Sequence, residues 1–206
     1  MIGEAGHYNQ AMSELDQFPV ALLLAAGAGS RFGGDKLLHP LEDGVAMAAH
    51  AARTMREAGL DVMAVVRPGD YPLREVLEIE GCTVRVCADA AQGMGASLAH
   101  GISETRDAAG WIVALADMPR IRTETIARVV HMLVQGQPLV APAYKAERGH
   151  PVGFGRRFLN ELLALGGDTG ARAVVQRNQA LLQMFESDDP GVLRDIDRRS
   201  DIAHSA

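Results

Sequence analysis

The strongest constraint in this sequence is a short apolar run that passes directly into glycines. Val20–Leu24 reads VALLL without alternation, and the next residues are Ala25, Ala26, Gly27, Ala28 and Gly29. A continuous apolar run of this length, followed by glycines, predicts a buried strand that ends in a loop.

The residues of this loop combine accessible backbone with positive charge. Glycine allows the backbone to approach a ligand closely, and a turn of successive N–H groups forms a nest for anions. Arg31 and Lys36 add two cations within the same loop. The combination favours a site for a triphosphate, although a glycine-rich turn with solvated charges is the competing interpretation.

Two well-known phosphate loops are excluded by the residues that follow. A Walker loop needs Gly-Lys-Ser/Thr, but Gly34 is followed by Asp35 and Lys36 by Leu37. The dinucleotide-binding fingerprint needs a third glycine where Phe32 stands. The loop therefore predicts neither a P-loop ATPase nor a simple dinucleotide site.

Composition narrows the class of protein further. The chain has 206 residues, of which 48% are hydrophobic, and this favours one globular α/β domain. The net charge of −6 argues against a nucleic-acid-binding surface, and no apolar run approaches the roughly 20 residues that cross a bilayer. Residues 1–17 lack the basic start and apolar core of a signal peptide, so we expect a flexible tail before a domain at 18–206 in a cytoplasmic protein.

The two cysteines fit the same compartment. Cys82 and Cys87 are five residues apart on one expected strand, so their side chains point to opposite faces. This spacing excludes a mutual disulfide and a shared metal, and it indicates two core thiols.

Apolar periodicity divides the rest of the chain into alternating strands and helices. We expect strands at 62–66, 83–88, 111–116, 139–142 and 181–185, and helices at 45–58, 73–79, 98–106, 125–134 and 158–165. This alternation predicts a mostly parallel sheet with helices on both faces and a single domain. The element order therefore predicts a Rossmann-like three-layer α/β sandwich.

Asp117 follows the expected strand at 111–116 directly and precedes Met118 and Pro119. Open α/β sheets bind ligands at the carboxyl ends of their strands, which is where this carboxylate would lie. Thr123 is better placed to cap the next helix. We therefore interpret Asp117 as a Mg²⁺ ligand, since Mg²⁺ is held by one or two carboxylates together with substrate phosphates.

Three further segments are ambiguous when they are read from their residues alone. Gly93 and Ser97 precede the expected helix at 98–106, which fits an anion site or an ordinary strand–helix turn. His150 is held between Gly and Pro, although a lone histidine is more often structural. Asp168 precedes another expected helix, where an acid in the first turn complements the helix dipole.

The opening loop, LAAGAGSRFGGDK, resembles the signature loop of molybdenum cofactor cytidylyltransferase-like enzymes, the MobA-like NTP transferases. In that family the loop Leu-Ala-Ala-Gly-x-Gly-x-Arg and a lysine five residues later hold an incoming nucleoside triphosphate. The resemblance implies the nucleotide-binding residues Leu24, Ala25, Ala26, Gly27, Gly29, Ser30, Arg31 and Lys36. The fold that it implies is that of the nucleotide-diphospho-sugar transferases.

The same resemblance extends to the ambiguous segments. It implies that Gly93 and Ser97 contact the nucleotide, and that an acceptor substrate lies near Gly149, His150, Pro151, Asp168 and Arg172. It also implies that Asp197 is the second Mg²⁺ ligand. The sequence departs from the family at Arg198 and Arg199, which replace Thr-Pro, and this weakens the assignment of Asp197.

The implied reaction is transfer of CMP from CTP to the terminal phosphate of a molybdopterin-type cofactor, with release of pyrophosphate and with Mg²⁺ as cofactor. Leu-Ala-Ala-Gly and Gly-His-Pro are typical of cytidylyl enzymes, whereas guanylyl enzymes tend to read Leu-Ala-Gly-Gly. Arg31, Lys36 and Asp117 are the expected catalytic residues. The alternatives are a guanylyltransferase, a sugar- or alcohol-phosphate nucleotidyltransferase, and a non-catalytic protein that delivers the cofactor to a molybdenum hydroxylase.

Overall fold

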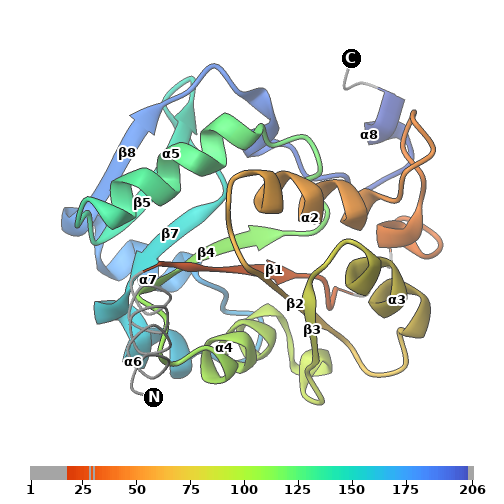
Figure 1. Cartoon of the computed structure of the whole chain (residues 1–206), viewed down its shortest axis with the longest axis horizontal. Coiled ribbons are helices and arrows are strands. Elements are labelled where there is room, and N and C mark those ends of the chain that lie inside the picture. Colours follow the sequence, from red (N-terminus) through yellow and green to blue (C-terminus); the bar gives the residue numbers. More distant parts are fainter. Residues whose placement is uncertain (1–17, 28, 30, 204–206) are drawn as a thin grey trace, which may run out of the picture.

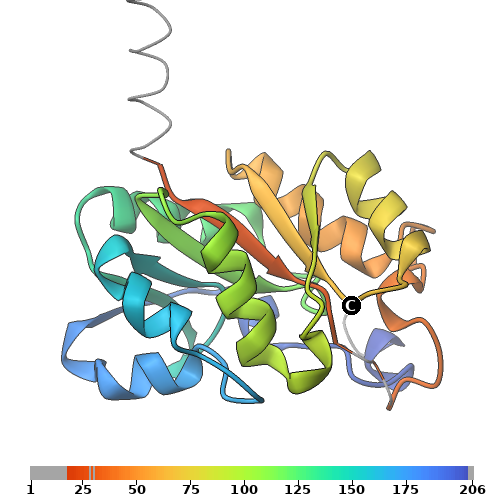
Figure 2. The same ribbon diagram turned by 90° about the horizontal axis from the view of Figure 1, so that it is seen from below.

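The computed structural model describes residues 18–27, 29 and 31–203, so the expected tail at 1–17 and Ser30 lie outside the described residues. The described chain forms one eight-stranded sheet between two layers of helices (Figures 1 and 2). Helices α2, α3 and α5 cover one face, and α4, α6 and α7 cover the other. This arrangement confirms the expected single-domain, three-layer α/β fold.

The sheet has the strand order β3-β2-β1-β4-β7-β5-β6, and β8 pairs with the other side of β5. Strands β1, β2, β3 and β4 are parallel to their neighbours in this group, and β8 is parallel to β5. Strand β7 runs antiparallel to β4 and β5, and β6 runs antiparallel to β5. The bounds are β1 Val20–Leu24, β2 Val62–Val66, β3 Thr83–Val86, β4 Gly110–Leu115, β5 Leu139–Tyr144, β6 Glu147–Arg148, β7 Val152–Gly155 and β8 Leu182–Glu186.

Strands and helices alternate as expected from β1 to β5, but β5, β6 and β7 follow one another without an α-helix between them. The helices are α2 Met47–Glu57, α3 Tyr71–Ile79, α4 Met94–Glu104, α5 Thr123–Val134, α6 Leu159–Leu163, α7 Arg172–Arg177 and α8 Ser200–Ala203. Short 3₁₀ turns occur at η1 Lys36–Leu38, η2 Ala90–Gln92, η3 Arg156–Phe158, η4 Gln179–Leu181 and η5 Pro190–Leu193.

Apolar side chains on the two faces of the sheet form separate cores. On one face, Met55 of α2 and Leu77 of α3 pack over β1 and β2; on the other face, Ile102 of α4 packs beside Trp111. Cys82 belongs to the first core and Cys87 to the second, which confirms that they point to opposite faces. Burial raises the pKa of the Cys82 thiol to about 11, so this thiol is protonated at neutral pH.

The helix starts differ from the sequence expectation by one to four residues, and two of them show a physical reason. Helix α5 begins at Thr123 itself, its N-cap position is Arg122, and the Thr123 hydroxyl donates to Glu57 of α2 instead of capping. Helix α4 begins at Met94, four residues before the expected start, so Gly95 lies inside its first turn. A glycine is needed there because a Cβ would lie 2.6 Å from the Thr169 carbonyl oxygen.

His150 lies in a short bend at residues 149–151, between strands β6 and β7, which the sequence did not predict. Strand β7 contains Gly153, where a Cβ would lie 2.7–2.8 Å from side-chain carbons of Leu133 and Val129 on α5. The missing side chain lets α5 pack closely onto the sheet, and it also removes the apolar pattern by which a strand is recognised.

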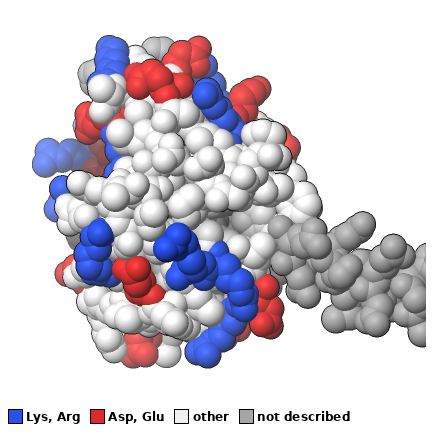
Figure 3. Space-filling model, turned by 90° about the vertical axis from the view of Figure 1, so that its left-hand side faces the viewer, with Lys and Arg blue, Asp and Glu red and all other residues white. Residues whose placement is uncertain are grey.

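Strand β8 forms an outer edge of the sheet, where Gln183 and Met184 are exposed. Figure 3 shows this side of the molecule, with charged side chains gathered above and below a band of uncharged ones. Within the described residues, no helix is long and apolar enough to cross a membrane.

Candidate active site

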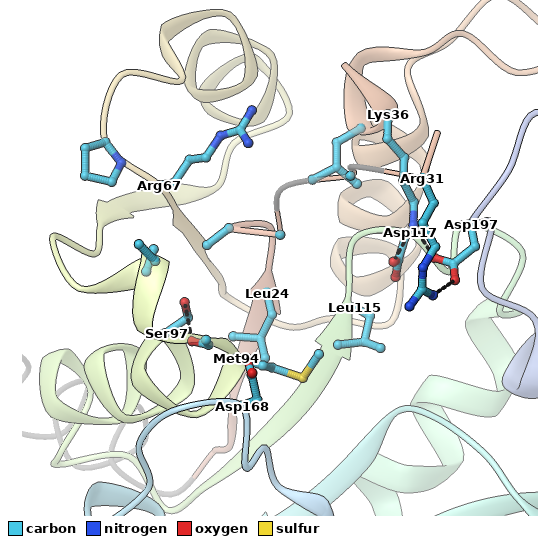
Figure 4. Close-up of a pocket in the computed structure, with 18 of the residues that line it drawn as sticks. Leu24, Arg31, Lys36, Arg67, Met94, Ser97, Leu115, Asp117, Asp168 and Asp197 are labelled. Carbon is cyan, nitrogen blue, oxygen red and sulfur yellow. Dashed lines mark hydrogen bonds and ion pairs between the residues drawn. The ribbon is translucent and has the colours of Figure 1, made fainter. Parts of the chain in front are cut away.

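The carboxyl ends of β1, β2 and β4 surround a cavity of about 720 Å³. Its volume is within the range of small-molecule sites, and it lies where open α/β sheets bind ligands. Eleven of the residues proposed from the sequence line it: Leu24, Ala26, Gly27, Gly29, Arg31, Lys36, Gly93, Ser97, Asp117, Asp168 and Asp197. Figure 4 shows several of them directed into this space.

The glycine loop is fixed by one apolar anchor. Phe32 is buried against Met47 of α2 and Ile196, and the guanidinium of Arg199 lies 5.5 Å from the centre of its ring. Gly29 has a φ of +58°, a left-handed conformation that glycine adopts without strain. Phe32, which stands where a dinucleotide site would need glycine, thus attaches the loop to the protein.

Lys36 begins η1 and its side chain is only 8% exposed. Its Nζ donates to Asp117 Oδ2 at 2.8 Å and to Asp197 Oδ1 at 3.1 Å. Burial alone would lower the pKa of this ammonium, but the hydrogen bonds and charges of the two carboxylates outweigh burial and raise its pKa above the usual value. The glycine loop and the acid that follows β4 therefore meet directly (Figure 4).

Asp197 is positioned by its neighbours in the C-terminal segment. The Asp201 carboxylate accepts from the backbone N–H of Asp197 at 3.0 Å and of Arg198 at 2.7 Å. Hydrogen bonding from Lys36, followed by that from Arg31 at 3.0 Å, lowers the pKa of Asp197. The departure from the family at Arg198 thus leaves Asp197 within the site.

A third carboxylate, that of Asp195, lies beside these two. Ligand atoms of Asp117, Asp195 and Asp197 lie within 4.8 Å of one another. Asp117 Oδ1 is buried and has no hydrogen-bond partner among the described residues. Oxygen ligands with an unsatisfied buried acceptor fit a hard divalent cation. Sequence reasoning missed Asp195, and its only signal was its position two residues before Asp197.

The start of α4 and the loop before α7 form another part of the cavity wall. Gly93 is the N-cap residue of α4, and the Asp168 carboxylate occupies the space that a Cβ on Gly93 would need. Helix α7 begins only at Arg172 and has no acidic residue in its first turn, so the helix-dipole explanation for Asp168 is wrong. Asp168 instead lines the cavity.

The other residues proposed for the acceptor do not line this cavity: Gly149, His150, Pro151 and Arg172. His150 is nevertheless linked to it, because the His150 N–H donates to the Val192 carbonyl and the Ile196 N–H donates to the Asp117 carbonyl, each at 2.9 Å. One short segment therefore holds both His150 and Asp117.

His150 is neutral at pH 7. Burial, reinforced by the charge of Arg148 and opposed by that of Asp117, lowers its pKa to about 4. Its Nδ1 is buried without a hydrogen-bond partner among the described residues. The ring can therefore donate or accept a hydrogen bond but does not supply positive charge.

Sequence reasoning also missed part of the cavity lining, and one residue that it assigned to the nucleotide, Ala25, lies outside the cavity. The residues that it missed are Leu37, Arg67, Pro68, Ala88, Ala90, Ala91, Met94 and Leu115. Arg67 follows an apolar strand directly, the same signal that pointed to Asp117. Ala25 does not line the cavity, because it is 1% exposed and its N–H donates to the Val65 carbonyl at 2.9 Å.

Known proteins resemble this chain over nearly its whole length. It is 26% identical to the purine catabolism protein PucB of Bacillus subtilis over 86% of this chain and 91% of the relative. It is 29% identical to nicotine blue oxidoreductase of Paenarthrobacter nicotinovorans over 85% of this chain and 90% of the relative.

Solved structures share the fold. Rv0371c of Mycobacterium tuberculosis matches with a TM-score of 0.79 at 25% identity, over 90% of this chain and 95% of that one. The same protein in complex with manganese matches with a TM-score of 0.76 at 23% identity, over 90% of this chain and 96% of that one. The family model described as the MobA-like NTP transferase domain matches residues 21–182. Because this family model matches most of the chain, the protein is a nucleotidyltransferase of the MobA-like NTP transferase family.

Proposed function

We propose that this nucleotidyltransferase transfers CMP from CTP to the terminal phosphate of a molybdopterin-type cofactor and releases pyrophosphate. The observation that carries the proposal is the contact of Lys36, from the glycine loop, with both Asp117 and Asp197. One cavity thus combines backbone and cations for a triphosphate with carboxylates for a metal.

The chemistry requires positioning rather than a general base. An oxygen of the acceptor phosphate attacks the α-phosphorus of CTP, and the bond from that phosphorus to the bridging oxygen of pyrophosphate breaks. The attacking phosphate is already anionic at neutral pH. The barrier comes from bringing two anions together and from charge that builds on the leaving group, both of which cations can reduce.

The two cations of the glycine loop and the three clustered carboxylates each have a role in this scheme. Arg31 and Lys36 would bind phosphate oxygens and neutralise the leaving pyrophosphate. Asp117, Asp195 and Asp197 would hold Mg²⁺, which when bound would neutralise phosphate charge and orient the triphosphate. The buried Oδ1 of Asp117, which accepts no hydrogen bond from any residue that the structure describes, fits this use. The manganese complex of Rv0371c, which shares the fold, also fits it.

Recognition of CTP and of the acceptor is assigned to the walls of the cavity. Ala26, at the position where guanylyl enzymes tend to have glycine, lines the cavity and would discriminate between bases. Gly149, His150 and Pro151 would face the acceptor together with Asp168 and Arg172. The neutral ring of His150 would serve as a hydrogen-bonding group in that role.

Pyrophosphate release tests the proposal. The purified chain is supplied with CTP, GTP, UTP or ATP and Mg²⁺, with and without molybdopterin-type cofactor. We expect release only when CTP and the cofactor are both present. Asp117→Asn should abolish it, whereas Asp188→Asn, which changes a carboxylate that is 94% exposed, should not.

Other outcomes would identify the alternatives. Release with GTP, or with a sugar or alcohol phosphate as acceptor, would replace the proposed substrates. If the wild-type chain releases no pyrophosphate and Asp117→Asn still matures a molybdenum hydroxylase, the chain is a delivery protein and the proposal fails. Under the proposal, a molybdenum hydroxylase in the cytoplasm receives the product.

A further inference from the structure

Arg67 has no assigned role, although it lines the cavity beside the proposed nucleotide loop. It follows β2 directly, and the strand order places β1 between β2 and β4. Two strand spacings, about 10 Å, therefore separate the backbone at Arg67 from the end of β4 that leads to Asp117. Figure 4 shows Arg67 on the opposite side of the cavity from Lys36 and Asp197.

The guanidinium of Arg67 is held in place by one carboxylate. Its Nε donates to Asp70 Oδ2 at 3.0 Å, and the Asp70 side chain is only 12% exposed. Asp70 stands at the N-cap position of α3 but makes no capping hydrogen bond with its side chain. A carboxylate at this position usually caps its helix. The Asp70 carboxylate instead accepts from Arg67 and fixes the orientation of its guanidinium.

This contact uses the Nε of Arg67 and leaves its two terminal nitrogens for a ligand. They make no hydrogen bond to any described residue, and the side chain is 36% exposed. Pro68, which follows Arg67, and Ala88, Ala90 and Ala91, which follow the neighbouring strand β3, also line the cavity. Small apolar side chains near an oriented guanidinium suit a flat ring with hydrogen-bonding atoms on one edge.

We infer that Arg67 reads the nucleobase and selects a base that presents two neighbouring hydrogen-bond acceptors. Cytosine presents O2 and N3, which match the paired N–H donors of a guanidinium. Uracil presents a donor at N3, and adenine sets an amino donor beside its ring nitrogens, so each places a donor against a donor. The inference rests on the proposed function for the choice of cytosine, because guanine also offers two adjacent acceptors, O6 and N7.

The test is equilibrium binding of CTP, UTP, GTP, ATP and inorganic tripolyphosphate, each with Mg²⁺, to wild type and Arg67→Gln. We expect the wild type to prefer CTP to UTP and ATP by roughly 10- to 100-fold, since bidentate arginine contacts discriminate on this scale. Arg67→Gln should lose that preference and leave tripolyphosphate binding unchanged. Arg74→Gln, which breaks an exposed pair with Glu78 on α3, is the matched control.

Asp70→Asn adds a check on orientation. It retains Arg67 but removes the charge that holds it, so we expect partial loss of the CTP preference without loss of tripolyphosphate binding. Equal loss for all ligands, tripolyphosphate included, would make Arg67 a phosphate ligand and overturn the inference. An unchanged CTP preference in Arg67→Gln would also overturn it.

The proposed function can fail separately. If the wild type prefers GTP and Arg67→Gln weakens GTP but not ATP, Arg67 reads the base while the assignment of CTP is wrong. If the wild type prefers CTP and Arg67→Gln retains that preference, the inference alone fails.

Discussion

At one end of the cavity, Arg31 and Lys36 contact carboxylates directly, whereas the Arg67 guanidinium lies across the cavity from them, at the end that alanine residues also line. The first end has several charges that compensate one another, so its members act as a unit. At the second end Asp70 holds the Arg67 guanidinium in one orientation, so its effect depends on the shape of the ligand. Changes at the first end should affect every nucleotide, and changes at the second should affect some nucleotides only.

The largest effect is expected for Lys36. Lys36→Met removes the ammonium that neutralises phosphate charge, and loss of such a group typically costs about 10²- to 10³-fold in rate. The rate of pyrophosphate release should fall by this factor for every nucleotide that the enzyme uses. Lys145→Met, at an exposed turn before β6, is the control. A loss of rate with one nucleotide only would contradict the claim that the charged end acts on every nucleotide.

The burial of His150, next to the charged end of the cavity, can be tested through the pH dependence of stability. The pKa of His150 in the folded protein is about 4, below the ordinary value of 6.5, so the unfolded chain binds the proton more readily between these pH values. The free energy of unfolding should therefore be at its full value above pH 6.5 and fall as the pH is lowered toward 4. The contribution should be about 2 to 3 kcal/mol at pH 4.5.

Urea unfolding at pH 7 and pH 4.5 measures this contribution. Wild type should lose more stability than His150→Gln between the two pH values, because glutamine does not titrate there. An identical loss in both proteins would show that the His150 ring is free to take up a proton in the folded state.

The wall at the apolar end depends on Gly95. In an open helix position, Gly95→Ala would stabilise by up to about 1 kcal/mol. Here a Cβ would lie 2.6–2.9 Å from three carbonyl oxygens of residues 166–169, so we expect a destabilisation of about 2 kcal/mol. Thermal unfolding should show the sign, and Gly166→Ala, where a Cβ would meet nothing within 4 Å, is the control. A more stable Gly95→Ala would contradict the close packing of this wall.

The smallest effect is expected at Ala26, between the two ends. Ala26→Gly removes one methyl group from the cavity wall, and a single methyl changes discrimination by roughly tenfold at most. The ratio of kcat/KM for CTP to that for GTP should fall several-fold. Ala25→Gly, a change at a residue outside the cavity, should leave the ratio unchanged. Equal changes in both variants would indicate an effect on the packing after strand β1 rather than on recognition of the base.

The sequence predicted the first half of the sheet better than the second. Strands β1, β2 and β4 are buried on both faces, so their apolar runs are continuous and easily recognised. Strand β7 contains Gly153, which is required by packing against α5 and carries no hydrophobic signal. Close packing of backbone against a helix is a tertiary constraint, and local periodicity does not record it.

Site residues that directly follow a strand could be predicted from the sequence. The sequence missed or misassigned residues that segments distant in the sequence bring into the site. Lys36 and Asp117 were both assigned to the site, and they meet there because they follow parallel strands whose carboxyl ends share one edge of the sheet. Asp195 joins them through the C-terminal segment, whose path is set by contacts such as that of Ile196 with Asp117. Asp168 was attributed to a helix that begins four residues later.

Binding of Mn²⁺ in the presence of CTP, followed by electron paramagnetic resonance, tests most directly whether the glycine loop and the carboxylates form one metal–nucleotide site. Wild type should bind Mn²⁺ with CTP, and Asp117→Asn and Asp197→Asn should each weaken this binding by roughly tenfold or more. Asp188→Asn should bind as wild type does. Unchanged binding in both Asp117→Asn and Asp197→Asn would contradict the account.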